Sequence, residues 1–171
     1  MKTAHKAYLE ACKGINIKKN EKIILESKNS YYCYYFAFDI PGANIKAHEE
    51  VVLKSKHPQH CYLFARYIPE ANTKAHEKLI LENKNPEYCY YFAMDIKNSN
   101  KEKLFKAMLE FGDRYWIYAF IKDMDLTKNI DFNKDKLFKV ILEFGDKDYI
   151  NYFLENIEFD KEKFANYILF I

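Results

Sequence analysis

The chain has 171 residues, a mass of 20.5 kDa and a formal net charge of +2. Its 49% apolar and 30% charged residues, with only 4 Gly and 4 Pro, exclude collagen-like, low-complexity and disordered chains and argue against an all-β fold. The small net charge makes neither nucleic acid nor an anionic membrane the default partner, and without a long apolar run or an apolar leader we expect a cytoplasmic protein.

The sequence repeats with a period of 28 residues. Segment 44–68 reads NIKAHEEVVLKSKHPQHCYLFARYI and segment 72–96 reads NTKAHEKLILENKNPEYCYYFAMDI, so more than half of the aligned positions are identical. Self-similarity at such a period is typical of repeat architectures. In chain order we expect a leading helix within 1–18, repeats at about 19–43, 44–71, 72–99, 100–131 and 132–158, and a half repeat at 159–171 that forms a capping helix.

Each repeat is predicted to be a helical hairpin. In its second half, Cys61, Phe64, Ala65 and Ile68 are spaced as on one face of a helix. Between the halves, a proline at the first helical position or a Gly-Asp pair ends one helix and starts the next. Because two short helices cannot bury their apolar faces alone, neighbours must stack. The sequence therefore predicts one all-α domain, 1–171, an α-solenoid of about five helical hairpins with an N-terminal helix and a C-terminal half repeat.

The repeated pattern is KAHE, then a proline-started helix with YCY and FA, as at 74–77 and 86–93. It resembles uncharacterised tandem-repeat proteins of low-GC bacteria and their phages. In class it also resembles HEAT, armadillo and TPR proteins, although their periods are longer and their consensus motifs are absent. The resemblance covers 21–96 closely and 101–157 loosely, and it implies a fold and a genomic setting without an activity.

Residues that could carry chemistry are better explained by packing. Cys33, Cys61 and Cys89 share one column of the repeat on the apolar face of the second helix, which predicts a core position. His48 and His76 precede glutamates but lack the second histidine of the HExxH zinc pattern, so we expect them to bond a neighbouring repeat or solvent. We predict no catalytic residues, no metal site and no cofactor.

Recognition residues are expected where the repeats differ. The constant tyrosine column of Tyr34, Tyr62, Tyr90 and Tyr118 either packs against the first helices or lines a groove, and tyrosine is enriched in binding hot spots. Columns that change chemistry between repeats are free to carry specificity. From these columns we predict a partner-binding groove of Tyr31, Tyr32, His60, Arg66, Tyr88, Trp116 and Lys122.

The sequence thus predicts a non-enzymatic protein-binding scaffold. The resemblance narrows this to an inhibitor that a phage or mobile element uses against a bacterial defence effector, as an anti-CRISPR protein blocks an RNA-guided nuclease. One alternative is binding of RNA or single-stranded DNA, for which only Arg66 and Arg114 supply guanidinium groups. Another is a hydrolase with a site assembled from scattered residues. The apolar end at 163–171 also predicts that copies of the chain could associate there.

Overall fold

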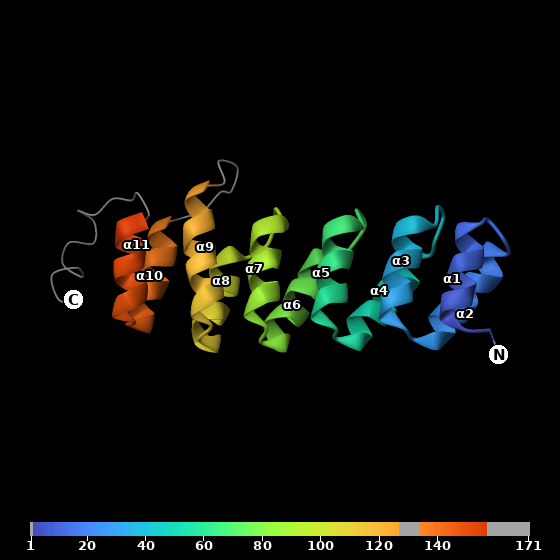
Figure 1. Ribbon diagram of the computed structural model, residues 1–171, viewed down its shortest axis with the longest axis horizontal. Coiled ribbons are helices and arrows are strands. Elements are labelled where there is room, and N and C mark those ends of the chain that lie inside the picture. The colour runs from blue at the N-terminus through green and yellow to red at the C-terminus, as the bar shows by residue number, and fades with distance from the viewer. Residues whose placement is uncertain (1, 127–133, 157–171) are drawn as a thin grey trace. The chain divides into compact units, whose positions relative to one another are not determined.

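The computed structural model describes residues 2–126 and 134–156 (Figure 1). Within these residues the chain contains eleven α-helices and no strand, which confirms the all-α class. The predicted capping helix at 159–171, and with it the predicted contact between copies, lies outside the described residues. The helices are α1 (Ala4–Cys12), α2 (Ile17–Ser27), α3 (Ser30–Asp39), α4 (Ile45–Ser55), α5 (Pro58–Tyr67), α6 (Thr73–Asn83), α7 (Pro86–Asp95), α8 (Lys101–Phe111), α9 (Arg114–Leu126), α10 (Lys134–Phe144) and α11 (Lys147–Asn156).

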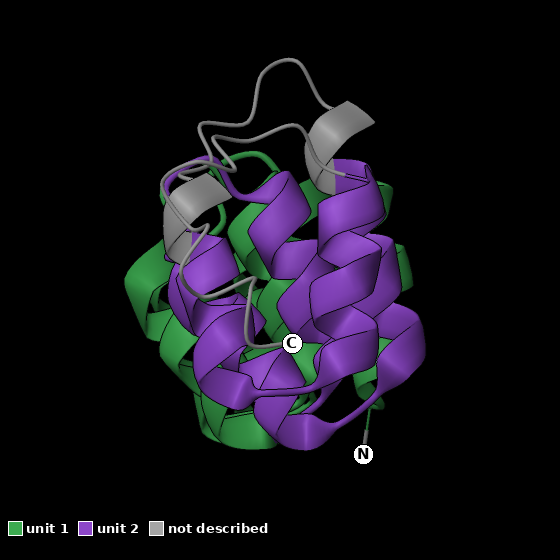
Figure 2. Ribbon diagram, turned by 90° about the vertical axis from the view of Figure 1, so that its left-hand side faces the viewer, with its two compact units in different colours: residues 1–83 green, residues 84–171 purple. Residues whose placement is uncertain are grey.

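The helices belong to two compact units, residues 1–83 and 84–171, which are coloured separately in Figure 2. In unit 1, α1, α3 and α5 contact one another in succession, and α2, α4 and α6 form a second layer against them. In unit 2, α7, α9 and α11 form one layer and α8 and α10 the other. Each unit is therefore a two-layered stack of helical hairpins, the arrangement expected of an α-solenoid. We call the layers the odd helices and the even helices.

The core of each unit is built from equivalent positions of successive repeats. Phe36 and Phe64 in unit 1 are fully buried at one position of the odd helices, and Phe92, Phe120 and Phe153 are fully buried at the same position in unit 2. Cys33, Cys61 and Cys89 are also fully buried, which confirms their predicted core role. Burial raises the pKa of each of these three thiols to about 12, so they stay protonated and pack as small apolar groups.

The turns from even to odd helices follow one scheme. The residue after the even helix has a positive φ, 54° at Lys56 and 72° at Gly112, and its N–H caps the helix. The next residue caps the odd helix in other turns, as Asp113 does by accepting hydrogen bonds from the N–H groups of Tyr115 and Trp116, whereas His57, after Lys56, makes no side-chain cap and precedes Pro58. The predicted Gly-Asp punctuation is therefore confirmed.

Buried histidines join successive repeats of unit 1. Glu21 Oε1 on α2 lies 3.2 Å from His48 Nε2 on α4 and accepts a hydrogen bond from the Asn44 N–H at 2.6 Å. Glu49 repeats the arrangement one period later, with its Oε1 3.1 Å from His76 Nε2. Both histidine rings are fully buried. Of the two predicted partners, a neighbouring repeat or solvent, the structure shows the neighbouring repeat, and these bonds hold the even helices in register.

Candidate functional site

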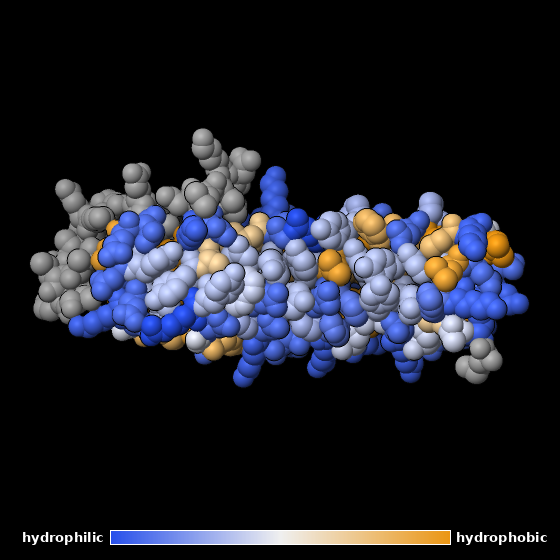
Figure 3. All heavy atoms as spheres, in the orientation of Figure 1, coloured by the Kyte–Doolittle hydropathy of each residue, from blue (hydrophilic) through white to orange (hydrophobic). Residues whose placement is uncertain are grey.

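Tyrosine and tryptophan are confined to one layer in the described part of the chain. Among the described residues, every tyrosine and the single tryptophan of the sequence lie on odd helices, and the even helices carry neither. Figure 3 shows, over α7, α9 and α11, many pale side chains of the intermediate hydropathy typical of tyrosine, interspersed with blue polar ones. Buried phenylalanines occur in both layers, such as Phe64 on α5 and Phe105 on α8, whereas the buried tyrosines Tyr34 and Tyr149 lie on odd helices.

In unit 1, the structure brings together three of the predicted site residues. Tyr31 on α3 lies with its ring 5.1 Å from that of Tyr32 and 5.9 Å from that of His60 on α5, and its side chain is 46% exposed. His60 Nδ1 is 2.8 Å from Ser30 Oγ, and burial, with a contribution from His57, lowers the pKa of His60 to about 4. The imidazole is therefore neutral at physiological pH, and the cluster presents aromatic surface and hydroxyl groups without adding charge.

Arg66 occupies a different place, in the last turn of α5. Its guanidinium carbon lies 5.3 Å from the ring centroid of Tyr67 and 5.9 Å from that of Tyr62, and its Nη1 donates a hydrogen bond of 2.6 Å to the Tyr62 hydroxyl. The side chain is thus folded onto tyrosines of its own helix.

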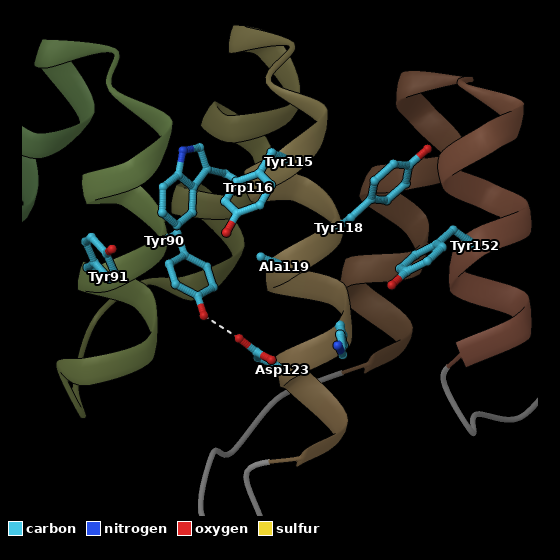
Figure 4. A pocket seen from close by; sticks show the side chains of 9 residues that line it. Tyr90, Tyr91, Tyr115, Trp116, Tyr118, Ala119, Asp123 and Tyr152 are labelled. Carbon is cyan, nitrogen blue, oxygen red and sulfur yellow. Dashed lines mark hydrogen bonds between the residues drawn. The ribbon is translucent and has the colours of Figure 1, made fainter.

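Unit 2 contains a pocket of about 470 Å³ on the side of the odd helices (Figure 4). Of the predicted site residues, Trp116 and Lys122 line it, whereas Tyr88 does not and lies with its ring 6.2 Å from that of Tyr91. Tyr90 and Tyr118, for which packing and a groove were both left open, also line the pocket. The other lining residues were not among the predicted site residues: Tyr91, Tyr115, Ala119, Asp123 and Tyr152.

The pocket coincides with a small residue in an otherwise bulky column. The equivalent positions on α3, α5, α7 and α11 are Tyr35, Leu63, Tyr91 and Tyr152, whereas α9 has Ala119 there. The missing ring leaves space between the rings of α7 and those of α11. The alanine at position 119 is visible in the sequence. It would have been recognised only by comparing the equivalent positions of the repeats for an unusually small residue.

The rings around the pocket are packed against each other. The Trp116 ring lies 5.2 Å from Tyr90, 5.4 Å from Tyr91 and 4.9 Å from Tyr115, measured between centroids. Such tilted and edge-to-face pairs are favourable geometries that hold the lining in place. On the other side of the pocket, the rings of Tyr118 and Tyr152 are 4.6 Å apart.

A hydrogen bond crosses the pocket lining from α7 to α9. The Tyr90 hydroxyl donates to Asp123 Oδ2, as the dashed line in Figure 4 marks. Burial and the neighbouring Asp123 carboxylate raise the pKa of Tyr90, so its hydroxyl stays protonated and remains a donor. Tyr8 and Asp39 form the same kind of bond between α1 and α3 in unit 1. The bond therefore ties consecutive odd helices together.

Charge is also divided between the layers of unit 2. The odd helices α7, α9 and α11 contain more acidic than basic residues, whereas the even helices α8 and α10 contain more basic than acidic ones. Arg114, one of the few cations on the odd helices, donates from Nη1 to Asp148 Oδ2 at 2.8 Å and lies 3.6 Å from Asp146. The aromatic side of unit 2 is thus the more acidic side.

No helix in the described ranges combines the length and apolar character needed to span a membrane. Comparisons of the chain with protein-family models, with curated proteins and with solved structures found no match.

Proposed function

We propose that this chain is a non-enzymatic scaffold that binds another protein through the aromatic side of its odd helices. The observation that carries the proposal is that, within residues 2–126 and 134–156, tyrosine and tryptophan occur on the odd helices alone. Tyr34 is nearly fully buried and serves packing, but Tyr31 and Tyr115 are 46% and 70% exposed. Exposed tyrosines on rigid helices provide a large contact area at a small entropic cost, as in protein-binding surfaces.

The distribution of charge favours a protein over a single-stranded nucleic acid. A surface for single strands combines stacking rings with basic side chains that follow the phosphates. In unit 2 the rings lie on helices with an acidic balance, and the basic balance is found on α8 and α10 instead. Arg66 and Arg114 are each engaged with tyrosines or carboxylates of the chain itself.

The pocket of unit 2 also supports a binding role over hydrolysis. Besides tyrosines, the ionisable groups of its lining are Lys122 and Asp123. The Asp123 carboxylate accepts a hydrogen bond from the Tyr90 hydroxyl. Hydrolytic nucleophiles are activated by a base that accepts their proton. With its raised pKa, the Tyr90 hydroxyl acts here as a tether between helices.

The narrower proposal is that the partner is a bacterial defence effector such as an RNA-guided nuclease, in the cytoplasm of the host cell. It rests on the resemblance of the KAHE and YCY pattern to phage-associated repeats. It is tested by adding the full chain to a purified RNA-guided nuclease of a low-GC bacterium. We expect lost cleavage and co-elution on size exclusion; full cleavage across a panel of such effectors would reject this partner class.

The broader proposal is tested by capture from an extract of the source organism with three versions of the immobilised chain. The wild type and the control Lys78→Ala, an exposed substitution on even helix α6, are expected to retain the same protein. The double variant Tyr31→Ala and Tyr115→Ala, on odd helices, is expected to lose it. Retention by the double variant, or recovery of nucleic acid in place of protein, would overturn the proposal.

A further inference from the structure

The pocket of unit 2 is large enough to hold a side chain of another molecule. Ala119 forms part of its lining where the other repeats place a tyrosine or leucine, and the cavity of about 470 Å³ exceeds the volume of a single large side chain. The surrounding rings are fixed by their mutual contacts and by the bond from Tyr90 to Asp123. A preorganised cavity of this kind loses little entropy on binding.

The lining attracts cations. Six aromatic rings surround the cavity, those of Tyr90, Tyr91, Tyr115, Trp116, Tyr118 and Tyr152. The face of an aromatic ring attracts a positive group, most strongly at tryptophan, and arginine is the side chain most often found there. A planar guanidinium also stacks on such rings while its N–H groups reach acceptors at the edge.

The chain itself shows this pairing on its odd helices. Arg66 lies over the rings of Tyr62 and Tyr67, and the guanidinium carbon of Arg114 lies 5.7 Å from the ring centroid of Tyr149. The two arginines of the sequence therefore both rest on tyrosines of the odd helices. The pocket has the same kind of rings without an arginine among its lining residues.

The charge around the pocket agrees with a basic ligand. The half-buried Asp123 lies in its lining, and α7, α9 and α11 have an acidic balance. Lys122 is the cation among the lining residues, and its positive charge opposes a positive ligand. Because its side chain is exposed, it can be substituted to test the effect of charge.

We propose that the pocket of unit 2 receives an arginine side chain from an extended segment of the protein partner. The guanidinium stacks against the aromatic lining around Trp116, and the carboxylates of α7, α9 and α11 provide the complementary charge. This inference rests on the proposed function, because it names the chemistry of the segment that the aromatic side recognises.

Trp116 provides the readout, since it is the only tryptophan of the sequence and lines the pocket. The full chain is titrated with a capped pentapeptide of sequence Ala-Ala-Arg-Ala-Ala while tryptophan fluorescence is recorded, and then with the same peptide carrying citrulline, which is neutral and nearly isosteric. We expect a saturable change with the arginine peptide and binding about fivefold weaker with the citrulline peptide. Equal binding of the two peptides, or no saturable change, would overturn the inference.

Two variants locate the binding. Ala119→Leu introduces the residue that α5 has at Leu63, so the fold tolerates it at this position, and it should abolish the fluorescence change by filling the cavity. Leu63→Tyr makes a change in the same column of unit 1 and should leave the titration unaltered. Lys122→Glu should tighten binding about threefold or more, because it replaces an opposing positive charge with an attracting negative one. If Ala119→Leu, shown to be folded by circular dichroism, still binds the peptide, the pocket is not the site.

This outcome is separable from that of the proposed function. If the wild type captures a protein through Tyr31 and Tyr115 while the arginine peptide does not bind, the inference fails and the proposed function stands. If the peptide binds at the pocket but no captured protein depends on the odd helices, the proposed function fails instead.

Discussion

His48 Nε2 lies 3.2 Å from Glu21 Oε1, a carboxylate on the preceding repeat, and the imidazole is stacked on Phe36 with a centroid distance of 5.0 Å. One carboxylate oxygen thus accepts from a buried ring and from the Asn44 backbone N–H at the start of the same helix. The arrangement is repeated by Glu49 and His76. It makes the stacking of unit 1 depend on polar bonds as well as on its apolar core.

Removing the carboxylate is expected to destabilise unit 1. Glu21→Ala leaves the buried His48 Nε2 and the Asn44 N–H without their acceptor, at a cost of about 1 to 3 kcal/mol in the free energy of unfolding. Glu26→Ala on the same helix is the control, since its exposed pair with Lys22 at 3.8 Å contributes under about 0.5 kcal/mol. Chemical denaturation followed by circular dichroism measures both; equal losses would show that the bond does not stabilise the stack.

Stability is expected to fall as the solution becomes mildly acidic. Burial lowers the pKa of His48 and His76 below the unfolded value, and their glutamate partners oppose this shift only in part. The unfolded chain therefore takes up protons first as the pH falls below about 6.5, and the stability present above that pH is lost toward the folded pKa. Each histidine contributes at most about 1.4 kcal/mol per pH unit.

The measurement is the unfolding free energy between about pH 7 and about pH 5 for the wild type and for His48→Asn. Asparagine is chosen because Asn20 occupies the equivalent buried position on α2. The variant should have a shallower pH dependence whatever its absolute stability. An unchanged slope would contradict the assignment to His48.

The positive φ after each even helix predicts a stabilising substitution. Lys56 has a φ of 54°, in the left-handed region, where a residue with a Cβ loses about 1 kcal/mol or more of stability. Gly112 occupies the equivalent position with a φ of 72° and, having no Cβ, avoids this cost. Lys56→Gly should therefore raise stability by up to about 1 kcal/mol, and Gly112→Ala should lower it by a similar amount. Thermal melts of both variants check this, and a loss on Lys56→Gly would contradict it.

Core and surface aromatics are expected to respond in opposite ways. Phe64→Ala creates a cavity at a fully buried position of α5 and should cost about 3 to 5 kcal/mol. Tyr115→Ala removes a ring that is 70% exposed and should change stability by less than about 0.5 kcal/mol while weakening capture of the partner. A destabilised Tyr115→Ala with intact capture would show that this ring serves the fold.

The repeat made much of the fold predictable, because identical columns must occupy identical environments. The buried positions of Cys61 and Phe64 and the cap at Asp113 follow from spacing alone. The bond between Glu21 and His48 was predicted only as a contact of the histidine with a neighbouring repeat or with solvent, since the partner is fixed by how the even helices lie side by side.

The pocket was not predicted from the sequence. The site residues were chosen at repeat positions whose side chains change chemistry, and a position that is merely small was not considered. Tyr31, Tyr32 and His60 do meet in unit 1, and Trp116 and Lys122 share the pocket of unit 2. The pocket depends on Ala119, because its small side chain leaves empty the space that a tyrosine ring fills in other repeats. Such a signal becomes meaningful only when the neighbouring helices are known to surround the position.

The most direct test of the aromatic side as the binding surface is photo-cross-linking from single positions in the full chain. A photoreactive phenylalanine replaces exposed Tyr115 on α9 in one sample and exposed Lys78 on α6 in another, and both are irradiated in extract of the source organism. We predict a discrete cross-linked protein from position 115 and none from position 78. The same adduct from position 78, or cross-links from position 115 to nucleic acid alone, would contradict the account.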